Sequence, residues 1–208
     1  MIRGPRIPKG FTITYALIAL NVIVYVYTSY LSGSALVTSD DVLLKFGQDN
    51  YLVLQNGAYY QLLTSMFVHV SLDHIFGNML FLLIFGLRAE EMFDATEYLG
   101  IYLVSGLAGS LLSLVPTILF PSFDMVSAGA SGAIIGLFGA VVIYSRRSVG
   151  QSILTALLFA FFLFVISSAS PGVNVFAHAG GLAAGLLIGY CLGASRKTDA
   201  TYRFKYTY

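Results

Sequence analysis

The chain has 208 residues, of which 57% are hydrophobic and 10% charged, and its mean hydropathy is +0.81. This composition excludes a soluble domain and indicates a polytopic membrane protein built as one bundle. The net charge of +1 excludes a nucleic-acid partner, because no basic cluster is dense enough to follow phosphates. Cys191 is the only cysteine, which excludes intramolecular disulfides and cysteine metal clusters.

The first element is an apolar stretch, "FTITYALIALNVIVYVYTSYL", which follows the basic residues Arg3, Arg6 and Lys9. Its length of about 20 residues exceeds the h-region of a signal peptide and is enough to span a bilayer. We therefore expect a retained transmembrane helix over residues 11–31, after a short cytoplasmic segment, 1–10.

A long segment of mixed character follows, from 32 to 71. We expect it to be folded and partly inserted at the membrane interface, because its Tyr and Phe residues suit that layer. Hydropathy then predicts five more helices, over 73–88, 96–115, 131–145, 152–168 and 176–194. The expected fold class is an all-α membrane protein, with a six-transmembrane-helix core over 11–194 and a cytoplasmic tail over 195–208.

The basic residues predict the orientation of these spans. With six spans both ends of the chain share one side, and Lys45 is the only one of the 11 lysines and arginines on the other side. This asymmetry places both termini in the cytoplasm of a multi-pass cell-membrane protein. The long loop, the loop with Asp124 and the loop "SASPGVN" then face outward.

Polar side chains occur at one depth in three of the predicted helices. At about 1.5 Å per residue, His74, Ser131 and His178 lie roughly 21, 22 and 27 Å from the basic residues that end their helices. The hydrocarbon core is about 30 Å thick, so all three lie in its outer third. Asn78 is one turn deeper than His74 on the same face. Polar groups at this depth require a partner or a function.

Ser131 lies in "AGASGAIIG", at the start of the short fourth helix. The preceding segment "PSFDMVSAGA" is expected to dip into the membrane, which is tolerated where backbone lines a water cavity. A helix N-terminus leaves amide donors unpaired and carries the positive end of the dipole. Ser131 would therefore have oxyanion donors beside it.

Glycines recur every fourth residue in the fourth and sixth helices, at Gly132 and Gly136 and at Gly181, Gly185 and Gly189. Such stripes of small residues let helix backbones approach closely in lipid. If the two stripes face each other, the histidine that precedes the second stripe comes within reach of the serine that precedes the first. That histidine, His178, could then accept the proton of Ser131.

Each of these residues also has a structural interpretation. Ser131 alone could be a serine packed between helices, His178 a packing or proton-relay histidine, and Asn78 a helix-packing residue. "GASG" differs from the nucleophile elbow of soluble hydrolases, because position 133 is Ala. The shared depth of a hydroxyl, two imidazoles and a carboxamide favours a site over packing alone.

Three motifs together resemble the rhomboid intramembrane serine proteases: "HVSLDHIFGN" entering the second helix, "GASG" opening the fourth, and "AHAGGLAAG" in the sixth. The resemblance covers nearly the whole chain and matches the minimal six-helix form of the family. It implies cleavage of the transmembrane segments of other membrane proteins near their outer ends, within the lipid bilayer. It implies no cofactor and no metal.

The resemblance also implies roles for individual residues. Ser131 would be the nucleophile and His178 its general base, without an acidic third member. His74, Asn78 and the backbone amide of Ser131 would be the oxyanion donors, and His69 would be a structural histidine of the loop.

Two positions depart from the pattern of the family. Ile135 stands where an aromatic residue often packs under the catalytic histidine, which would loosen the orientation of that ring. Tyr60-Gln61 stands where a Trp-Arg pair is usual, which would alter the stability of the long loop.

Two other functions compete with the protease. A non-catalytic rhomboid-like scaffold that binds client transmembrane helices would not need both Ser131 and His178. A transporter or proton channel would need acidic residues inside its spans or an inverted repeat, and the sequence shows neither. The protease is therefore the preferred interpretation.

Overall fold

The computed structural model describes residues 13–122, 125–146, 152–169 and 172–195, and this part of the chain is mostly helical, as expected. Its long helices are α1 (Ile13–Ser32), α5 (Leu72–Glu90), α6 (Ala95–Leu112), α8 (Ser131–Ser145), α9 (Ile153–Ser168) and α10 (Val175–Ser195). Its short elements are α2 (Asp40–Phe46), β1 (Gln48–Asp49), α3 (Asn50–Asn56), α4 (Gln61–Thr64), α7 (Val115–Leu119) and β2 (Val126–Ser127).

A helix forms at each of the segments for which hydropathy predicts one. By length and composition, α1, α5, the α6–α7 segment Ala95–Leu119 and α10 can each cross a membrane, whereas α8 and α9 are shorter apolar helices. α8 has 15 residues. At about 1.5 Å per residue it covers roughly 22 Å, less than the hydrocarbon core of about 30 Å.

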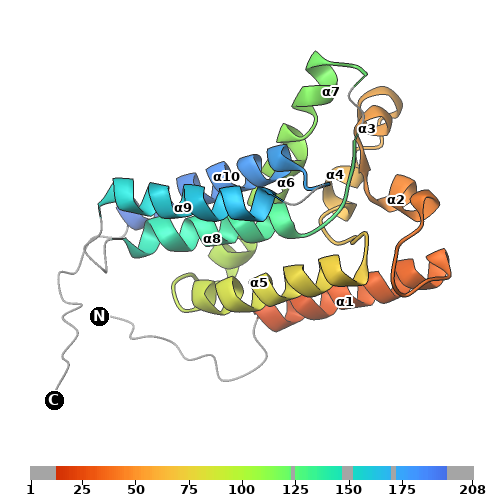
Figure 1. Cartoon of the computed structure of the whole chain (residues 1–208). Coiled ribbons are helices and arrows are strands. Elements are labelled where there is room, and N and C mark those ends of the chain that lie inside the picture. The colour runs from red at the N-terminus through yellow and green to blue at the C-terminus, as the bar shows by residue number, and fades with distance from the viewer. Residues whose placement is uncertain (1–12, 123–124, 147–151, 170–171, 196–208) are drawn as a thin grey trace.

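The third predicted helix ends earlier than the expected limit at residue 115. α6 stops at Leu112, and a separate short helix, α7, contains Pro116 in its first turn. Proline lacks a backbone N–H and its ring clashes with the preceding turn, so it starts a helix more readily than it continues one. The helix is therefore interrupted after Leu112, and α7 lies beyond the end of α6 (Figure 1).

The long helices form a bundle with the short elements gathered at one end. α8, α9 and α10 lie side by side along their lengths, α1 and α5 run beside each other, and α2, α3, α4 and α7 lie together at the end of the bundle (Figure 1). The closest helix–helix packing joins α10 to α8 and to α6.

The core is centred on α8, in which every residue from Gly132 to Ile143 is buried. Leu82 of α5 and Tyr98, Ile101 and Tyr102 of α6 belong to the same core and are fully buried. A helix that is apolar on all sides is expected to be enclosed by its neighbours. α9 is the opposite case, because only Ala156 and Ala160 of its residues are buried.

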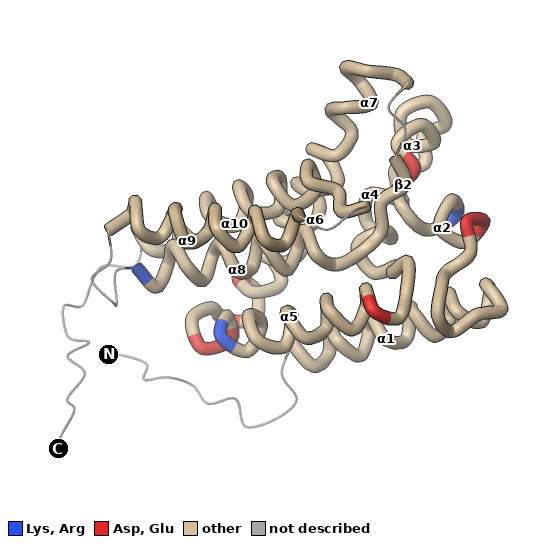
Figure 2. Tube along the Cα trace, in the orientation of Figure 1, with Lys and Arg blue, Asp and Glu red and all other residues tan. Residues whose placement is uncertain are grey.

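Charged residues of the described chain lie mostly at helix ends and in loops, and the middle of each long helix is almost free of them (Figure 2). Lys45 is in the last turn of α2, Arg88 pairs with Glu91 at the end of α5, and Arg146 follows α8. The other basic residues that predict the orientation lie outside the described residues, as do segment 1–10, nearly all of the tail and Asp124. The orientation therefore stays a prediction.

Candidate active site

Ser131 and His178 lie next to each other although 47 residues separate them in the chain. His178 Nε2 is 2.8 Å from Ser131 Oγ, which is hydrogen-bonding distance. Ser131 is the first residue of α8 and is partly exposed, whereas His178 in the first turn of α10 is buried. At this distance an imidazole nitrogen can accept the proton of a serine hydroxyl.

The glycines of α8 and α10 explain how these two side chains meet. A β-carbon on Gly181 would overlap the carbonyl of Gly132, and one on Gly185 would overlap the carbonyl of Gly136. On Gly189 it would lie 2.6 Å from the Cα of Ala140. The two backbones are thus in direct contact along the stripes, which is possible only without side chains.

Hydrogen bonds join the segment before Ser131 to two other parts of the chain, the region of β1 and α4 and the start of α10. β2 pairs antiparallel with β1, and the Gly129 amide donates to the Ser65 carbonyl at 2.9 Å. Asn174 caps α10 by accepting from the Ala177 amide at 3.0 Å, and its Nδ2 donates to Ser127 Oγ at 2.7 Å. The sequence analysis missed Asn174, although an asparagine directly before a helix is a capping signal.

His74 lies over the backbone that leads into Ser131. Gly129 has φ +134°, a conformation suited to glycine, and a β-carbon there would lie 3.0 Å from His74 Nε2 and 3.8 Å from Ser131 Oγ. The His74 ring and the Ser131 hydroxyl therefore both lie beside Gly129.

Asn78 is buried one turn after His74 on α5, and its Nδ2 donates to the His74 carbonyl at 2.9 Å. In the described part of the chain its amide is bonded within α5 and not to Ser131 or His178. The carboxamide has a second N–H, which that bond does not use.

His69 is fully buried in the loop before α5. Its Nδ1 lies 3.2 Å from the Phe67 carbonyl, its own carbonyl accepts from Thr38 Oγ1 at 2.7 Å, and its ring meets that of His74 edge-on. Burial, and to a smaller extent the neighbouring His74, lowers the pKa of His69 to about 3. The ring is therefore neutral at physiological pH and lies against the ring of His74.

Ser168 contacts His178 from the side opposite to Ser131. Its Oγ lies 3.0 Å from His178 Nδ1, at the last residue of α9. The sequence analysis missed Ser168. A usable signal was present, because Ser167 and Ser168 end the fifth predicted helix in the same outer layer as His178.

Gln61 and Ile135, the two residues that depart from the family pattern, are both buried. Gln61 is fully buried, its Nε2 donates to the Leu44 carbonyl at 2.7 Å, and its Oε1 accepts from the Asp49 amide at 3.0 Å. It thereby joins α4 to α2 and β1. Ile135 is buried in the apolar cluster that α8, α9 and α10 share, together with Phe138 and Leu182.

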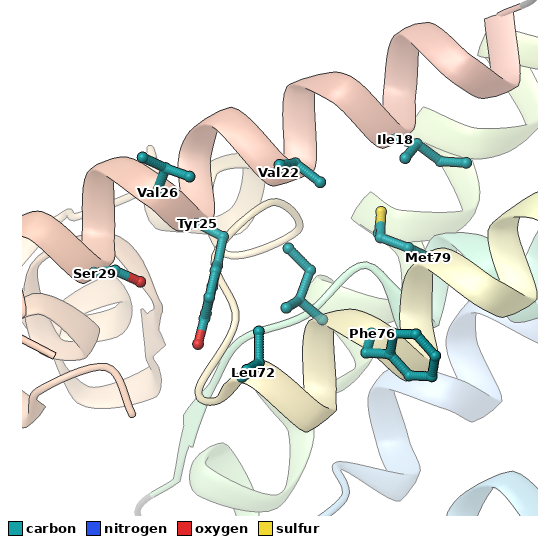
Figure 3. A pocket seen from close by; sticks show the side chains of 9 residues that line it. Ile18, Val22, Tyr25, Val26, Ser29, Leu72, Phe76 and Met79 are labelled. Atoms are coloured by element: carbon teal, nitrogen blue, oxygen red, sulfur yellow. The ribbon is translucent and has the colours of Figure 1, made fainter. Parts of the chain in front are cut away.

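An apolar groove of about 470 Å³ separates α1 from α5 (Figure 3). Tyr25 of α1 and Leu72 of α5 point toward the same space in it. None of the predicted catalytic or oxyanion residues lines the groove, and its only hydroxyls come from Tyr25 and Ser29. The candidate site is therefore the Ser131–His178 pair and not this groove.

The rhomboid domain family model matches residues 56–195. The chain belongs to the rhomboid family. With its apolar helices, it is a multi-pass membrane protein. The match covers α4 to α10 and includes each predicted catalytic and oxyanion residue of this rhomboid, whereas α1, α2 and β1 precede it.

Similar proteins carry the same family name. RHOMBOID-like protein 6, mitochondrial, of Arabidopsis thaliana is 38% identical over 161 residues, which are 74% of this chain and 50% of that protein. Rhomboid protease GluP of Bacillus subtilis is 32% identical over 190 residues, 88% of this chain and 35% of GluP. RHOMBOID-like protein 1 of Arabidopsis thaliana is 34% identical over 147 residues, 68% of this chain and 36% of that protein. This rhomboid thus spans half or less of the length of these relatives.

Proposed function

We propose that this rhomboid is an intramembrane serine endopeptidase that cleaves the transmembrane segments of other membrane proteins. The observation that carries the proposal is the 2.8 Å contact between His178 Nε2 and Ser131 Oγ. Membership of the rhomboid family and the printed name of GluP as a rhomboid protease support it.

The reaction follows from the positions of these two side chains. Ser131 Oγ attacks the scissile carbonyl while His178 Nε2 takes the hydroxyl proton, and His178 then gives that proton to the leaving amine. A water molecule, activated by the same histidine, hydrolyses the acyl-enzyme. The partial exposure of Ser131 is compatible with the entry of water to this position.

Negative charge that develops on the scissile carbonyl oxygen needs donors. The amides at the N-terminus of α8, including that of Ser131, are such donors because the first amides of a helix have no partner within it. The His74 ring lies against Gly129, close to the serine hydroxyl, and would supply a further donor. Asn78 would contribute its second N–H after a small movement of its side chain.

The decisive experiment measures cleavage of a labelled single-span substrate by the purified chain in liposomes. Wild type should cleave, and Ser131→Ala and His178→Ala should each lose cleavage while the bundle still melts cooperatively. Ser145→Ala is the matched control, because Ser145 ends the same helix and bonds only to the Val142 carbonyl in the described chain. A fluorophosphonate should modify Ser131, as located by mass spectrometry.

Two results would contradict the proposal. Turnover by pure Ser131→Ala would exclude Ser131 as the nucleophile, and an adduct on another serine would assign the role elsewhere. Binding of the substrate without cleavage by the wild type would favour a scaffold that holds client helices.

We further propose that α1, α5, α6, α8, α9 and α10 all cross the cell membrane, with both termini in the cytoplasm. The position of the basic residues supports this orientation. In intact cells, tags at Met1 and Tyr208 should resist an external protease, while the loop at Asp40 should be accessible. The reverse pattern would put the Ser131–His178 pair in the inner leaflet.

A further inference from the structure

We propose that Ser168 is a positioning residue that holds the His178 ring with Nδ1 protonated and Nε2 facing Ser131. The inference rests on the proposed function for its catalytic meaning. It starts from the contact between Ser168 Oγ and His178 Nδ1, at 3.0 Å, on the far side of the ring from Ser131.

The proton positions follow from the chemistry of a neutral imidazole, in which one nitrogen donates and the other accepts. His178 can take the Ser131 proton at Nε2 only if its own proton is on Nδ1. An N–H at Nδ1 needs an acceptor, because the ring is buried. Ser168 Oγ is placed to be that acceptor.

Ser168 can act as the acceptor because a hydroxyl oxygen carries two lone pairs in addition to its hydrogen. The last carbonyls of a helix lack amide partners, and serines in the last turn can donate to them. The neighbouring Ser167 does so, with its Oγ donating to the Phe164 carbonyl at 3.1 Å. A Ser168 hydrogen directed at a carbonyl in the same way would leave an Oγ lone pair facing His178 Nδ1.

A hydroxyl in this place orients the ring without adding a charge to the outer layer of the membrane, where a carboxylate would be costly. It also ties the end of α9 to the first turn of α10. α9 buries only Ala156 and Ala160 and otherwise packs on the bundle through the apolar cluster that it shares with α8 and α10. The hydrogen bond of Ser168 adds a polar contact at the end of this helix. The orientation of His178 thus depends on the position of the end of α9.

The kinetic test compares three variants. Ser168→Ala should lower kcat by about 10- to 100-fold with little change in KM, because it removes part of the general-base contribution and leaves substrate binding intact. Ser168→Thr keeps the hydroxyl and should restore most of the rate. Ser167→Ala is the matched control, and its rate should equal that of the wild type. Equal losses in Ser168→Ala and Ser168→Thr would overturn the proposal.

A second readout does not depend on activity. The chain has three histidines, so ¹⁵N-histidine labelling of untagged protein gives few NMR signals, and loss of a signal in His178→Asn assigns His178. We expect the Nδ1-protonated tautomer of His178 in the wild type and in Ser168→Thr. Ser168→Ala should shift the population toward the Nε2-protonated form. Unchanged tautomers in Ser168→Ala would overturn the inference even if its activity falls.

The two measurements separate this inference from the proposed function. An inactive wild type whose His178 tautomer changes in Ser168→Ala would contradict the protease and leave the role of Ser168 standing. An active wild type whose tautomer and kcat are both unaffected by Ser168→Ala would leave the protease standing and contradict the role of Ser168.

Discussion

The interface between α8 and α10 and the region from 33 to 71 are held together in different ways. Between α8 and α10, the glycine stripes bring backbone against backbone, with Gly181 and Gly185 lying directly on carbonyls of the other helix. In the region 33–71, buried polar side chains such as Gln48, Asn50 and Gln61 make the contacts.

The hydrogen bonds of the second region reach across to the end of the bundle. Gln48 Nε2 lies 2.9 Å from the Ser110 carbonyl and 2.7 Å from Ser113 Oγ. Asn50 Nδ2 donates to the Ser113 carbonyl at 2.7 Å and to Thr117 Oγ1 at 2.9 Å. These bonds join β1 and α3 to the end of α6 and the start of α7.

The two regions are held together differently because their backbones leave different numbers of amide and carbonyl groups unpaired. Long helices satisfy their own backbone groups, so their association in lipid depends on close van der Waals packing. Short helices and a two-residue strand pair leave amides and carbonyls that need side-chain partners. Mutations should therefore act through steric overlap in the first region and through lost hydrogen bonds in the second.

The largest effect is expected for Gly185→Ala. The added β-carbon overlaps the Gly136 carbonyl, so α8 and α10 must separate, at a cost of about 3 kcal/mol or more of folding free energy. Separation would also break the Ser131–His178 contact, so thermal stability and cleavage should fall together. In Gly100→Ala the β-carbon meets nothing within 4 Å, and stability should change by less than about 1 kcal/mol. Similar losses in both variants would refute the packing argument.

A smaller loss of stability is expected for Asn50→Ala. It leaves buried acceptors without their donor, which costs about 1–3 kcal/mol of unfolding free energy. The α8–α10 contact should survive, so the remaining folded protein should still react with a fluorophosphonate at Ser131. Asn56→Ala, at an exposed position of α3, is the matched control for chemical denaturation. Loss of labelling in folded Asn50→Ala would show that the two regions are not independent.

The second region should also respond to acid through His69. The folded chain keeps this ring neutral down to about pH 3, whereas an unfolded chain protonates it near the usual pKa of 6.5. Between these values the unfolded state binds more protons, so stability falls as pH falls from about 6.5 toward 3 and is full above that window. His69→Gln should flatten this part of a plot of melting temperature against pH. The same slope in wild type and variant would assign the acid response to other groups.

The smallest effect concerns the junction of the two regions, where α5 carries His74 and Asn78. Asn78→Ala should lower kcat about tenfold, equivalent to roughly 1.4 kcal/mol, because one oxyanion donor is lost and others remain. KM should change less, and Ser131 should still react with a fluorophosphonate. A large drop in melting temperature with normal specific activity of the folded fraction would instead make Asn78 a packing residue.

The sequence by itself determined where the helices form and which side chains to consider for a site. Apolar runs place helices because a backbone in lipid must satisfy itself, and the observed bounds of α5, α8, α9 and α10 lie close to the predicted ones. Local spacing also placed Ser131 at a helix start and His178 before a glycine stripe. Family membership could likewise be predicted from three short motifs.

Only the tertiary structure decided which of these groups touch. The rotation and offset of α8 against α10 set the distance between Ser131 and His178, and the position of α9 brings Ser168 to the other side of the same ring. The pairing of β1 with β2, the bond from Asn174 to Ser127 and the buried place of Gln61 joined segments that are distant in the chain. The glycine stripes and the family resemblance predicted that His178 would reach Ser131 if α8 and α10 faced each other. The contacts of Ser168, Asn174 and Gln61 could not be predicted, because periodicity describes one element at a time and these contacts depend on how separate elements pack.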